Sequence, residues 1–180
     1  MQKFIIISGP PASGKTTLSK NLAERFKYVL ISRDDYKESL FSIFNEVGRE
    51  WSKKIGFASY LIMYRALQSV LESGNSCIIE SNFNPDFDDE TFINLKQKYG
   101  FTAVQLICHA DEAVLIKRFQ ERAESGERHA DHGNEIDEDI LAQFRRKQRP
   151  FTVAKDNFIE VDTTDFSEID IEAIIKQLTS

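Results

Sequence analysis

The sequence predicts an α/β fold built around a parallel sheet. Short apolar runs rich in β-branched residues alternate with longer segments whose apolar residues recur at helical spacing, a pattern typical of strands joined by crossover helices. No internal repeat, low-complexity tract or Pro/Gly/Ser-rich linker divides the 180 residues. A chain of this length can bury a substantial core as one unit. We therefore expect a single α/β domain over residues 1–180.

Each expected strand is a short apolar run that ends in polar or turn-forming residues. The five strands are Lys3–Ser8, Tyr28–Ser32, Ser76–Glu80, Thr102–His109 and Asn157–Asp162. In open parallel sheets, ligands gather at the carboxyl ends of the strands. Here the polar residues that follow the strands collect at that rim: Gly9 to Thr16, Arg33 to Asp35, Glu80 to Asn82, Asp111, and Asp162 to Thr164.

The expected helices lie between these strands and after the last one. In the longest, apolar residues recur every three or four positions from Trp51 to Val70, which predicts a buried stripe. Gly74 and Gly100 follow two of the helices and Pro85 precedes a third, as is common at helix ends. The helical segments are Lys15–Phe26, Asp34–Phe44, Arg49–Ser73, Asp86–Tyr99, Asp111–Glu124, Asp137–Lys147 and Ser167–Leu178.

The composition predicts a cytoplasmic protein. Apolar residues make up 41% and charged residues 29% of the chain, and no run approaches the roughly 20 apolar residues that span a membrane. The apolar run Phe4–Ile7 is too short for a secretory signal. Cys77 and Cys108 lie in apolar contexts and form no CxxC pair, so we expect buried, reduced thiols.

The net charge of −6 disfavours nucleic acid as a partner without excluding it. Sequence-independent nucleic-acid binders usually gain affinity by neutralising phosphates with basic residues. The only candidate basic cluster is Arg145–Arg149, which also fits a solvated helix face.

Residues Gly9 to Thr16 match the phosphate-binding pattern G-x-x-x-x-G-K-[ST], with an apolar strand before the motif and a helix after it. Gly14 lets the backbone turn so that successive N–H groups face one anion, and the helix directs its positive end to the same point. Lys15 can reach the β- and γ-phosphates, and the Thr16 hydroxyl can bind Mg²⁺. The motif predicts a three-layer P-loop NTPase fold that binds ATP and Mg²⁺ through Gly9, Ala12, Ser13, Gly14, Lys15, Thr16 and Thr17.

Four segments together resemble a group of small P-loop kinases. They are GPPASGKTT (9–17), SRDDYKE (32–38), IIESNFNP (78–85) and IKRFQERAESGER (116–128). They resemble the kinase domain of polynucleotide kinases, and the wider group that includes zeta toxins and chloramphenicol phosphotransferase-like enzymes. The resemblance covers roughly residues 3–130 and is specific at the phosphate loop and at Arg-Asp-Asp-Tyr.

The resemblance implies that Asp34 is the general base. Taken alone, two adjacent acids at a strand end are also a common helix-capping or solvated arrangement. A hydroxyl acceptor must lose a proton as it attacks the γ-phosphorus, whereas a nucleoside monophosphate is already anionic and needs arginines instead. This contrast favours a hydroxyl acceptor. Polynucleotide kinases place an arginine three residues after the base, but this chain has Lys37, which cannot form a bidentate fork to phosphate.

Glu80 ends the third expected strand, where P-loop proteins carry an acid that approaches Mg²⁺ through water. The resemblance equally allows Glu80, Asn82 or Asn84 to contact the acceptor. A purely structural hydrogen bond of Glu80 is a further alternative.

The segment 125–135 is expected to form an arginine-rich lid after the fifth helix. Arg118 and Arg122 are four residues apart, so both project from one helix face. Mobile arginines neutralise the charge that spreads over the γ-phosphate oxygens during transfer. The resemblance implies that Arg122 contacts phosphate; Arg118 and Arg128 are further candidates for ATP binding. A solvated face in which Arg122 pairs with neighbouring glutamates is the alternative.

Two other features carry weaker signals. The residues His129, Asp131 and His132 are a poor zinc set, because the loop supplies no cysteine and only one carboxylate. In related kinases the loop that corresponds to residues 162–164 lies near the adenine.

We predict an ATP-dependent kinase that transfers the γ-phosphoryl group to a hydroxyl of a small molecule, or to a nucleic-acid 5′-hydroxyl. Lys15, Asp34 and Arg122 are the predicted catalytic residues. Asp34, Lys37, Glu80 and Asn82 are the predicted acceptor-binding residues. The alternatives are a nucleoside-monophosphate-type kinase and a P-loop ATPase or nucleotide-switched binding protein.

Overall fold

The computed structural model describes residues 2–44, 48–125 and 136–179. Its centre is one parallel sheet in the strand order β2-β3-β1-β4-β5. The strands are β1 (Lys3–Ser8), β2 (Val29–Ser32), β3 (Cys77–Glu80), β4 (Thr102–His109) and β5 (Phe158–Asp162). The predicted α/β class and the five parallel strands are confirmed.

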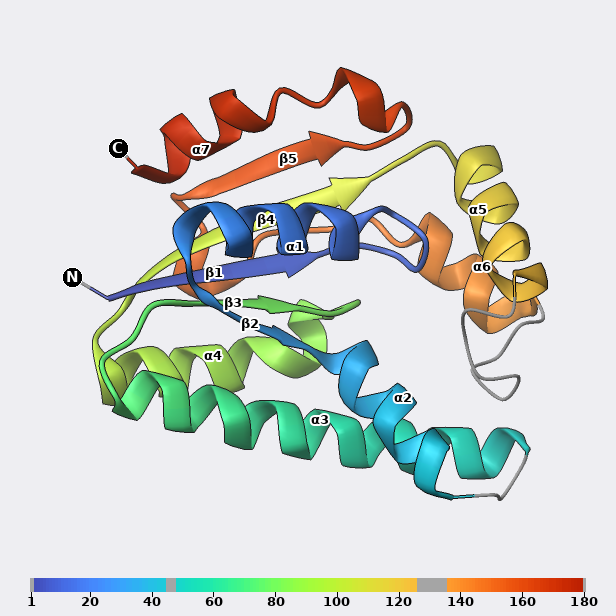
Figure 1. The fold of residues 1–180 in the computed structure, drawn as a ribbon, viewed down its shortest axis with the longest axis horizontal. Helices are drawn as coiled ribbons and strands as arrows, with labels where there is room; N and C mark the ends of the chain where they lie inside the picture. The colour runs from blue at the N-terminus through green and yellow to red at the C-terminus, as the bar shows by residue number, and fades with distance from the viewer. Residues whose placement is uncertain (1, 45–47, 126–135, 180) are drawn as a thin grey trace.

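Helices cover both faces of the sheet, which makes three layers (Figure 1). The helices are α1 (Lys15–Phe26), α2 (Arg33–Ile43), α3 (Arg49–Glu72), α4 (Pro85–Tyr99), α5 (Glu112–Glu124), α6 (Glu138–Arg145) and α7 (Ile171–Thr179). Two short 3₁₀ turns, η2 (Thr152–Ala154) and η3 (Phe166–Glu168), complete the described elements.

The core is divided by the sheet because successive strand residues point to opposite faces. Phe4 and Ile6 of β1 pack with Met63 of α3 and Phe92 of α4 on one face. On the other face, the alternate residues of β1 pack with α1 and α7, and this second cluster contains Ile5, Ile7, Leu18, Leu22, Ile174 and Leu178. A third, smaller cluster joins α5 and α6 beside the phosphate loop (Ala12, Leu115, Phe119, Phe144).

The strand register brings the chemistry-bearing segments together at one end of the sheet. Glu80, the last residue of β3, pairs with Ile7 of β1 on one side and with Ser32 of β2 on the other. The phosphate loop follows β1, and α2 begins directly after Ser32. Helices α5 and α6 lie beyond the same end of the sheet (Figure 1). The carboxyl ends of the strands therefore lie at the end of the sheet where α2, α5 and α6 are found.

All predicted element ends lie within two residues of the observed ones, except the start of the last helix. The expected helix Ser167–Leu178 is a 3₁₀ turn followed by α7. Asp165 accepts hydrogen bonds from Ser167 N and Oγ, and Asp170 accepts one from Ala173 N, so two successive caps start two separate helical segments.

The expected helix Asp137–Lys147 ends earlier, at Arg145. The next residue, Arg146, has an extended backbone, and its guanidinium donates to the Phe83 carbonyl oxygen at 3.0 Å. The basic cluster is therefore not a continuous helix face.

Buried thiols were expected, and both cysteines are buried and free. Burial raises the pKa of the Cys77 thiol and of the Cys108 thiol to about 12. Both thiols are therefore neutral at physiological pH.

Candidate functional site

The phosphate loop has a backbone shape that only small residues allow. Gly9 and Gly14 have φ values of 147° and 74°. A Cβ atom at Gly9 would collide with the carbonyl oxygen of Cys108, and one at Gly14 would lie 3.0 Å from the Phe166 ring. Both glycines are thus required by conformation and by close packing. Ala12 also has positive φ, at 62°.

The loop offers polar groups to an anion. Lys15 begins α1, and its Nζ atom donates to the Pro10 carbonyl oxygen at 2.7 Å. The Ser13 carbonyl oxygen accepts a hydrogen bond from Thr163 Oγ1 at 3.0 Å, which ties the loop to the end of β5. The Ser13 Oγ atom is buried and has no hydrogen-bond partner among the residues that the structure describes. A buried hydroxyl without a partner is unfavourable by itself, so this cradle fits a phosphate oxygen well.

Glu80 connects the loop with the end of β2. Its Oε1 atom accepts hydrogen bonds from Ser32 Oγ at 2.7 Å and from Thr16 Oγ1 at 3.3 Å. Only 2% of the Glu80 surface is exposed, so these two hydroxyls satisfy a buried carboxylate. A hydroxyl beside a carboxylate supplies the oxygen ligands that Mg²⁺ prefers. Thr16 and Glu80 therefore fit a Mg²⁺ ion bound together with nucleotide phosphates.

No group of three or more His, Cys, Asp and Glu side chains is arranged to hold a metal by itself among the described residues. The weak zinc candidates His129, Asp131 and His132 lie outside the described residues, as do Arg128 and most of the expected lid.

The first turn of α2 presents an ion pair to the same end of the sheet. Arg33 Nη2 donates to Asp34 Oδ1 at 3.1 Å, and the Asp34 side chain is 32% exposed. Lys37, one turn later, is buried; its Nζ atom lies 3.4 Å from Ser52 Oγ and 5.4 Å from the centroid of the Phe41 ring. Asp34 is therefore accessible, whereas Lys37 is held in the wall of the site.

Helices α5 and α6 supply the opposite wall. Arg118 Nη2 donates to the Thr164 carbonyl oxygen at 3.1 Å, while its buried Nη1 atom has no hydrogen-bond partner within the described part of the chain. Gln143 of α6 accepts a hydrogen bond from Asn82 Nδ2 at 2.8 Å. This amide pair links the loop after β3 to α6, although the two residues are 61 positions apart in sequence.

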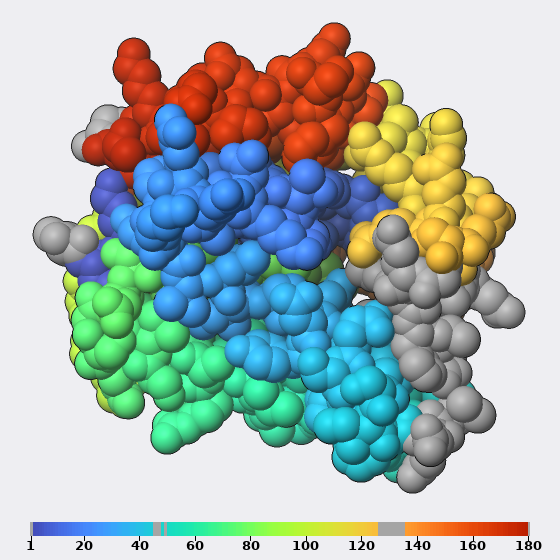
Figure 2. Space-filling view, viewed as in Figure 1, coloured from blue at the N-terminus to red at the C-terminus, as the bar shows by residue number. Residues whose placement is uncertain are grey.

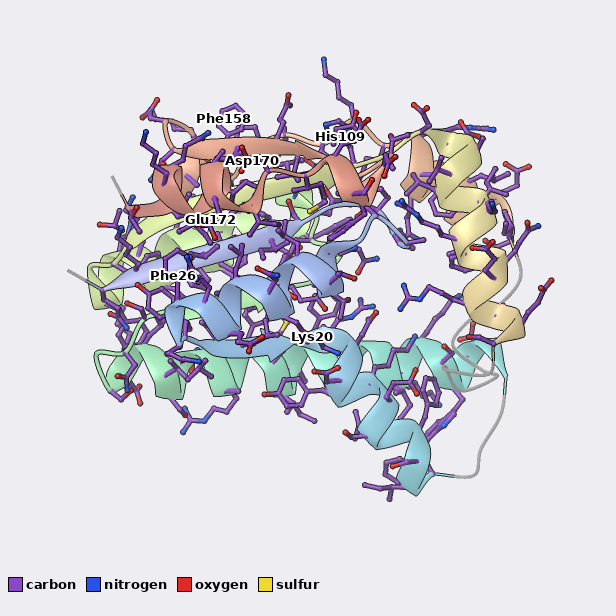
Figure 3. All side chains as sticks on the ribbon, turned by 45° about the horizontal axis from the view of Figure 1, so that its top comes forward. Lys20, Phe26, His109, Phe158, Asp170 and Glu172 are labelled. Carbon is purple, nitrogen blue, oxygen red and sulfur yellow. The ribbon has the colours of Figure 1, made fainter. Side chains whose placement is uncertain are left out.

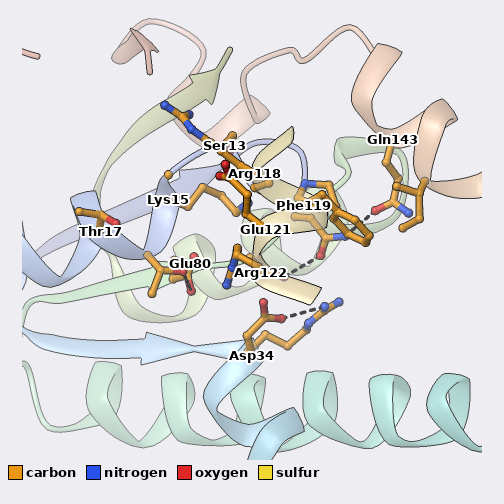
Figure 4. A pocket seen from close by; sticks show the side chains of 18 of the residues that line it. Ser13, Lys15, Thr17, Asp34, Glu80, Arg118, Phe119, Glu121, Arg122 and Gln143 are labelled. Carbon is orange, nitrogen blue, oxygen red and sulfur yellow. Dashed lines mark hydrogen bonds and ion pairs between the residues drawn. The ribbon is translucent and has the colours of Figure 1, made fainter. Parts of the chain in front are cut away.

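These groups line one cavity of about 840 Å³ (Figure 4). The predicted residues that line it are Ala12, Ser13, Gly14, Lys15, Thr16, Thr17, Asp34, Lys37, Glu80, Asn82, Arg118 and Arg122. Gly9 instead supports the loop from behind, against Cys108. Asn84, the third candidate for acceptor contact, caps α4 by accepting a hydrogen bond from Asp86 N.

The sequence predicts no role for several of the lining residues. Lys20 lies one helical turn after Thr16 and Arg33 adjoins Asp34, so helical spacing and neighbourhood could have indicated both. Gln143 and Phe166 come from distant parts of the chain and carried no local signal. Pro11, Arg33 and Ser81 belong to segments that the sequence places at this rim, although it predicts no role for them. The other lining residues without a predicted role are Lys20, Phe119, Glu121, Ser125, Ile140, Gln143 and Phe166.

The cavity is cationic although the chain is acidic. Its lining includes six cationic side chains (Lys15, Lys20, Arg33, Lys37, Arg118, Arg122) and three carboxylates (Asp34, Glu80, Glu121). The whole chain carries −6. Such a concentration of positive charge suits a polyphosphate ligand.

The basic cluster outside the cavity is engaged within the chain. Arg145 forms an ion pair with Glu112 at 2.7 Å, and Arg149 forms one with Asp86 at 2.9 Å. With Arg146 bound to the Phe83 carbonyl oxygen, three of its cations hold α6 and the following segment in place. The pKa of Glu112 lies below its ordinary value because Arg145 donates to it.

An anion-binding loop between a strand and a helix, a buried acid on the neighbouring strand and a cationic cavity define a kinase-like P-loop nucleotide-binding protein. The chain belongs to the AAA domain family AAA_33, whose model matches residues 4–151.

Solved structures show the same architecture. A Chloroflexus aurantiacus protein, provisionally named a kinase, is 35% identical and superposes with a TM-score of 0.91 over 99% of this chain and 97% of that one. A Janibacter sugar kinase is 15% identical, with a TM-score of 0.58 over 99% of this chain and 95% of that one. An uncharacterised Eubacterium ventriosum protein is also 15% identical, with a TM-score of 0.55 over 99% of each chain. These two distant matches show the fold alone. No curated protein matches the chain.

Within the part of the chain that the structure describes, none of the helices has the length and apolar content needed to cross a membrane.

Proposed function

We propose that this protein is an ATP-dependent kinase that phosphorylates a hydroxyl group of a small molecule. The observation that carries the proposal is that Asp34, an accessible carboxylate, lines the same cavity as the phosphate loop and the Thr16–Glu80 pair. The provisional naming of the 35% identical Chloroflexus protein as a kinase supports it.

Each wall of the cavity has a distinct task in this proposal. Bound Mg·ATP supplies an electrophilic γ-phosphoryl group whose charge is partly neutralised by the metal. The backbone amides of residues 12–16 and the Lys15 ammonium hold the phosphates. Thr16 binds the metal and Glu80 orients the Thr16 hydroxyl. Arg118 and Arg122 neutralise charge that develops on the γ-oxygens.

Asp34 takes the proton of the acceptor hydroxyl as that hydroxyl attacks phosphorus. The Arg33 guanidinium at 3.1 Å favours the ionised carboxylate, which is the form that accepts a proton. A nucleoside-monophosphate acceptor would need free arginines for its phosphate. Arg33, the arginine of the α2 wall, is already paired with Asp34, which supports a hydroxyl acceptor.

Two features support a small acceptor rather than a polynucleotide end. The part of the cavity that we assign to the acceptor, its acceptor end, is lined by Asp34, Lys37, Asn82 and Gln143, which come from α2, the loop after β3 and α6. Three cations of the basic cluster that could have tracked a nucleic-acid backbone bind the chain itself. Amide pairs such as Asn82–Gln143 can exchange hydrogen bonds with neutral hydroxyl groups.

An acceptor screen tests the proposal directly. Purified protein with Mg²⁺ and γ-labelled ATP is incubated with nucleosides, sugars, hydroxylated antibiotics and 5′-hydroxyl oligonucleotides. We expect label to transfer to one small-molecule class, and the Asp34→Asn variant to lose that transfer. ATP consumption that is independent of every acceptor and unchanged by Asp34→Asn would contradict the proposal.

A further inference from the structure

Tyr60 of α3 lies beneath the ion pair that contains the proposed base. The Arg33 guanidinium carbon is 4.8 Å from the centroid of the Tyr60 ring, within the range of a cation–π contact. Arg33 thus contacts an aromatic face while it donates to Asp34. Burial lowers the pKa of the Arg33 guanidinium, but Tyr60 and Asp34 outweigh this effect and the pKa lies above its ordinary value. Arg33 is therefore charged at any pH at which the enzyme works.

The hydroxyl of the same tyrosine approaches Ser81, in the loop after β3. Tyr60 Oη and Ser81 Oγ are 3.3 Å apart. Ser81 Oγ donates to Asn82 Oδ1 at 3.3 Å, and Asn82 Nδ2 donates to Gln143 Oε1 at 2.8 Å. Tyr60 therefore contacts both the Arg33–Asp34 pair and the chain of hydrogen bonds that ends in the amide pair.

Tyr60 is itself held in place. Its ring stacks on that of Tyr64, with centroids 6.3 Å apart and an interplanar angle of 25°. Tyr64 Oη donates to the buried Asp88 at 2.8 Å, and Asp88 accepts the Asn84 N–H at 2.7 Å. The stacked pair Tyr60–Tyr64 of α3 is therefore anchored to the start of α4 through Asp88.

We propose that Tyr60 is a positioning residue that holds the Arg33–Asp34 pair and links it, through Ser81, to the Asn82–Gln143 amide pair. The inference rests on the proposed function, because it assigns Asp34 as the base. Tyr60 itself does not line the cavity, so it acts through Arg33 and Ser81. It fixes the distance between the proton-accepting carboxylate on α2 and the amides that orient the acceptor. Misplacing a reacting group by about 1 Å can cost roughly 100-fold in rate, so such a support matters.

The test uses Tyr60→Leu and Tyr60→Phe, with Tyr99 as the matched control. Tyr99 packs against the same core cluster, has Lys98 4.7 Å from its ring centroid and donates its hydroxyl to Glu72, but it lies at the far end of α4. The readouts are single-turnover hydrolysis of Mg·ATP, in which water replaces the acceptor, and the Kd of Mg·ATP.

We expect Tyr60→Leu to lower the single-turnover rate by roughly 10- to 100-fold with the Kd of Mg·ATP unchanged, and Tyr99→Leu to leave both unchanged. Tyr60→Phe keeps the ring under Arg33 and loses the Ser81 link, so a loss of about threefold is expected, compared with none for Tyr99→Phe. Tyr60→Phe also serves as the test if the leucine variant fails to fold. Rates for the Tyr60 variants equal to those of the Tyr99 variants would overturn the inference.

A second measurement separates this inference from the proposed function. The free energy of unfolding is measured for Tyr60→Leu, Arg33→Met and the double variant. Direct coupling predicts that the double variant deviates from the sum of the single effects. If Asp34→Asn does not slow hydrolysis, the base assignment fails, and a non-additive cycle still supports the link between Tyr60 and Arg33. An additive cycle overturns that link. If Asp34→Asn slows hydrolysis and Tyr60→Leu does not, the proposed function stands and the positioning role is wrong.

Discussion

Lys15 is the residue on which nucleotide chemistry most depends in the proposed mechanism. Its ammonium is bound to the Pro10 carbonyl oxygen and lies at the cavity. Lys15→Ala removes the charge closest to the β- and γ-phosphates, where negative charge shifts during transfer. We expect phosphoryl transfer to fall by about 100-fold or more, with a loss in stability of only about 1 kcal/mol from the missing hydrogen bond. Single-turnover transfer and thermal unfolding measure the two effects. A variant that keeps more than about a tenth of the wild-type rate would show that Lys15 does not act there.

The adjacent acids of α2 provide an internal comparison. Asp34 lines the cavity and pairs with Arg33, whereas Asp35 does not line it. Asp34→Asn keeps the size of the side chain but removes the proton acceptor, so we expect a large loss of turnover with ATP affinity within a few-fold of wild type. Asp35→Asn should be much milder. Turnover and nucleotide affinity of both variants decide the assignment, and equal losses or the reverse order would show that the base is wrongly chosen.

The sequence predicts those site residues that belong to a local motif. The phosphate loop and the acid at the start of α2 could be found because their residues are neighbours in the chain and chemistry fixes their spacing. Gln143, Tyr60 and Phe166 could not. They reach the site through the packing of α6, α3 and η3, and no local motif connects them with the phosphate loop.

Among the elements, the start of α4 carries a buried acid that binds Tyr64, the stacking partner of Tyr60. Asp88 is buried there, accepting hydrogen bonds from Tyr64 Oη and Asn84 N. Burial raises the pKa of Asp88, although these hydrogen bonds and nearby arginines oppose the shift. The folded state thus disfavours the ionised carboxylate relative to the unfolded chain.

The sign of the resulting pH dependence follows from linkage. An acid whose pKa is raised on folding favours the folded state most fully below its unfolded pKa, about 3.9 for aspartate, and this contribution is lost as pH rises through the folded pKa. We therefore expect the free energy of unfolding of the wild type, relative to Asp88→Asn, to fall as pH rises across that window. Urea unfolding of both proteins at a series of pH values measures the difference, which removes the contributions of other carboxylates. A relative stability that rises with pH would contradict the raised pKa.

Element boundaries were predictable where local signals dominate. Gly100 ends α4 in a left-handed conformation, and Pro85 begins it. The division between η3 and α7 was not predicted, because periodic apolar residues run through it and the aspartate caps were indistinguishable from solvated acids. The end of α6 was missed for a related reason: the extended Arg146 is fixed by a tertiary bond to Phe83.

On the scale of the whole molecule, charge is strongly segregated. The chain carries −6, yet cations outnumber carboxylates in the cavity lining. Figure 2 shows a hollow between the blue segments of α1 and α2 and the yellow segment of α5. Figure 3, in which the top of the Figure 1 view comes forward, labels Lys20 on α1 and His109 at the end of β4. An acidic exterior repels polyanions, while a cationic hollow still attracts a nucleotide.

This segregation leads to a prediction about the acceptor. An enzyme that grips several backbone phosphates of a single strand loses affinity with salt at a slope of roughly −0.7 per contacted phosphate. A small neutral acceptor bound by amides and hydroxyls should show almost none of this dependence. We expect the acceptor KM to change less than about twofold between low and physiological salt. Arg149→Gln should leave it unchanged, because Arg149 is paired with Asp86 on the protein surface. Efficient phosphorylation of a 5′-hydroxyl oligonucleotide would instead establish a polynucleotide acceptor, if its KM rises steeply with salt and is raised further by Arg149→Gln.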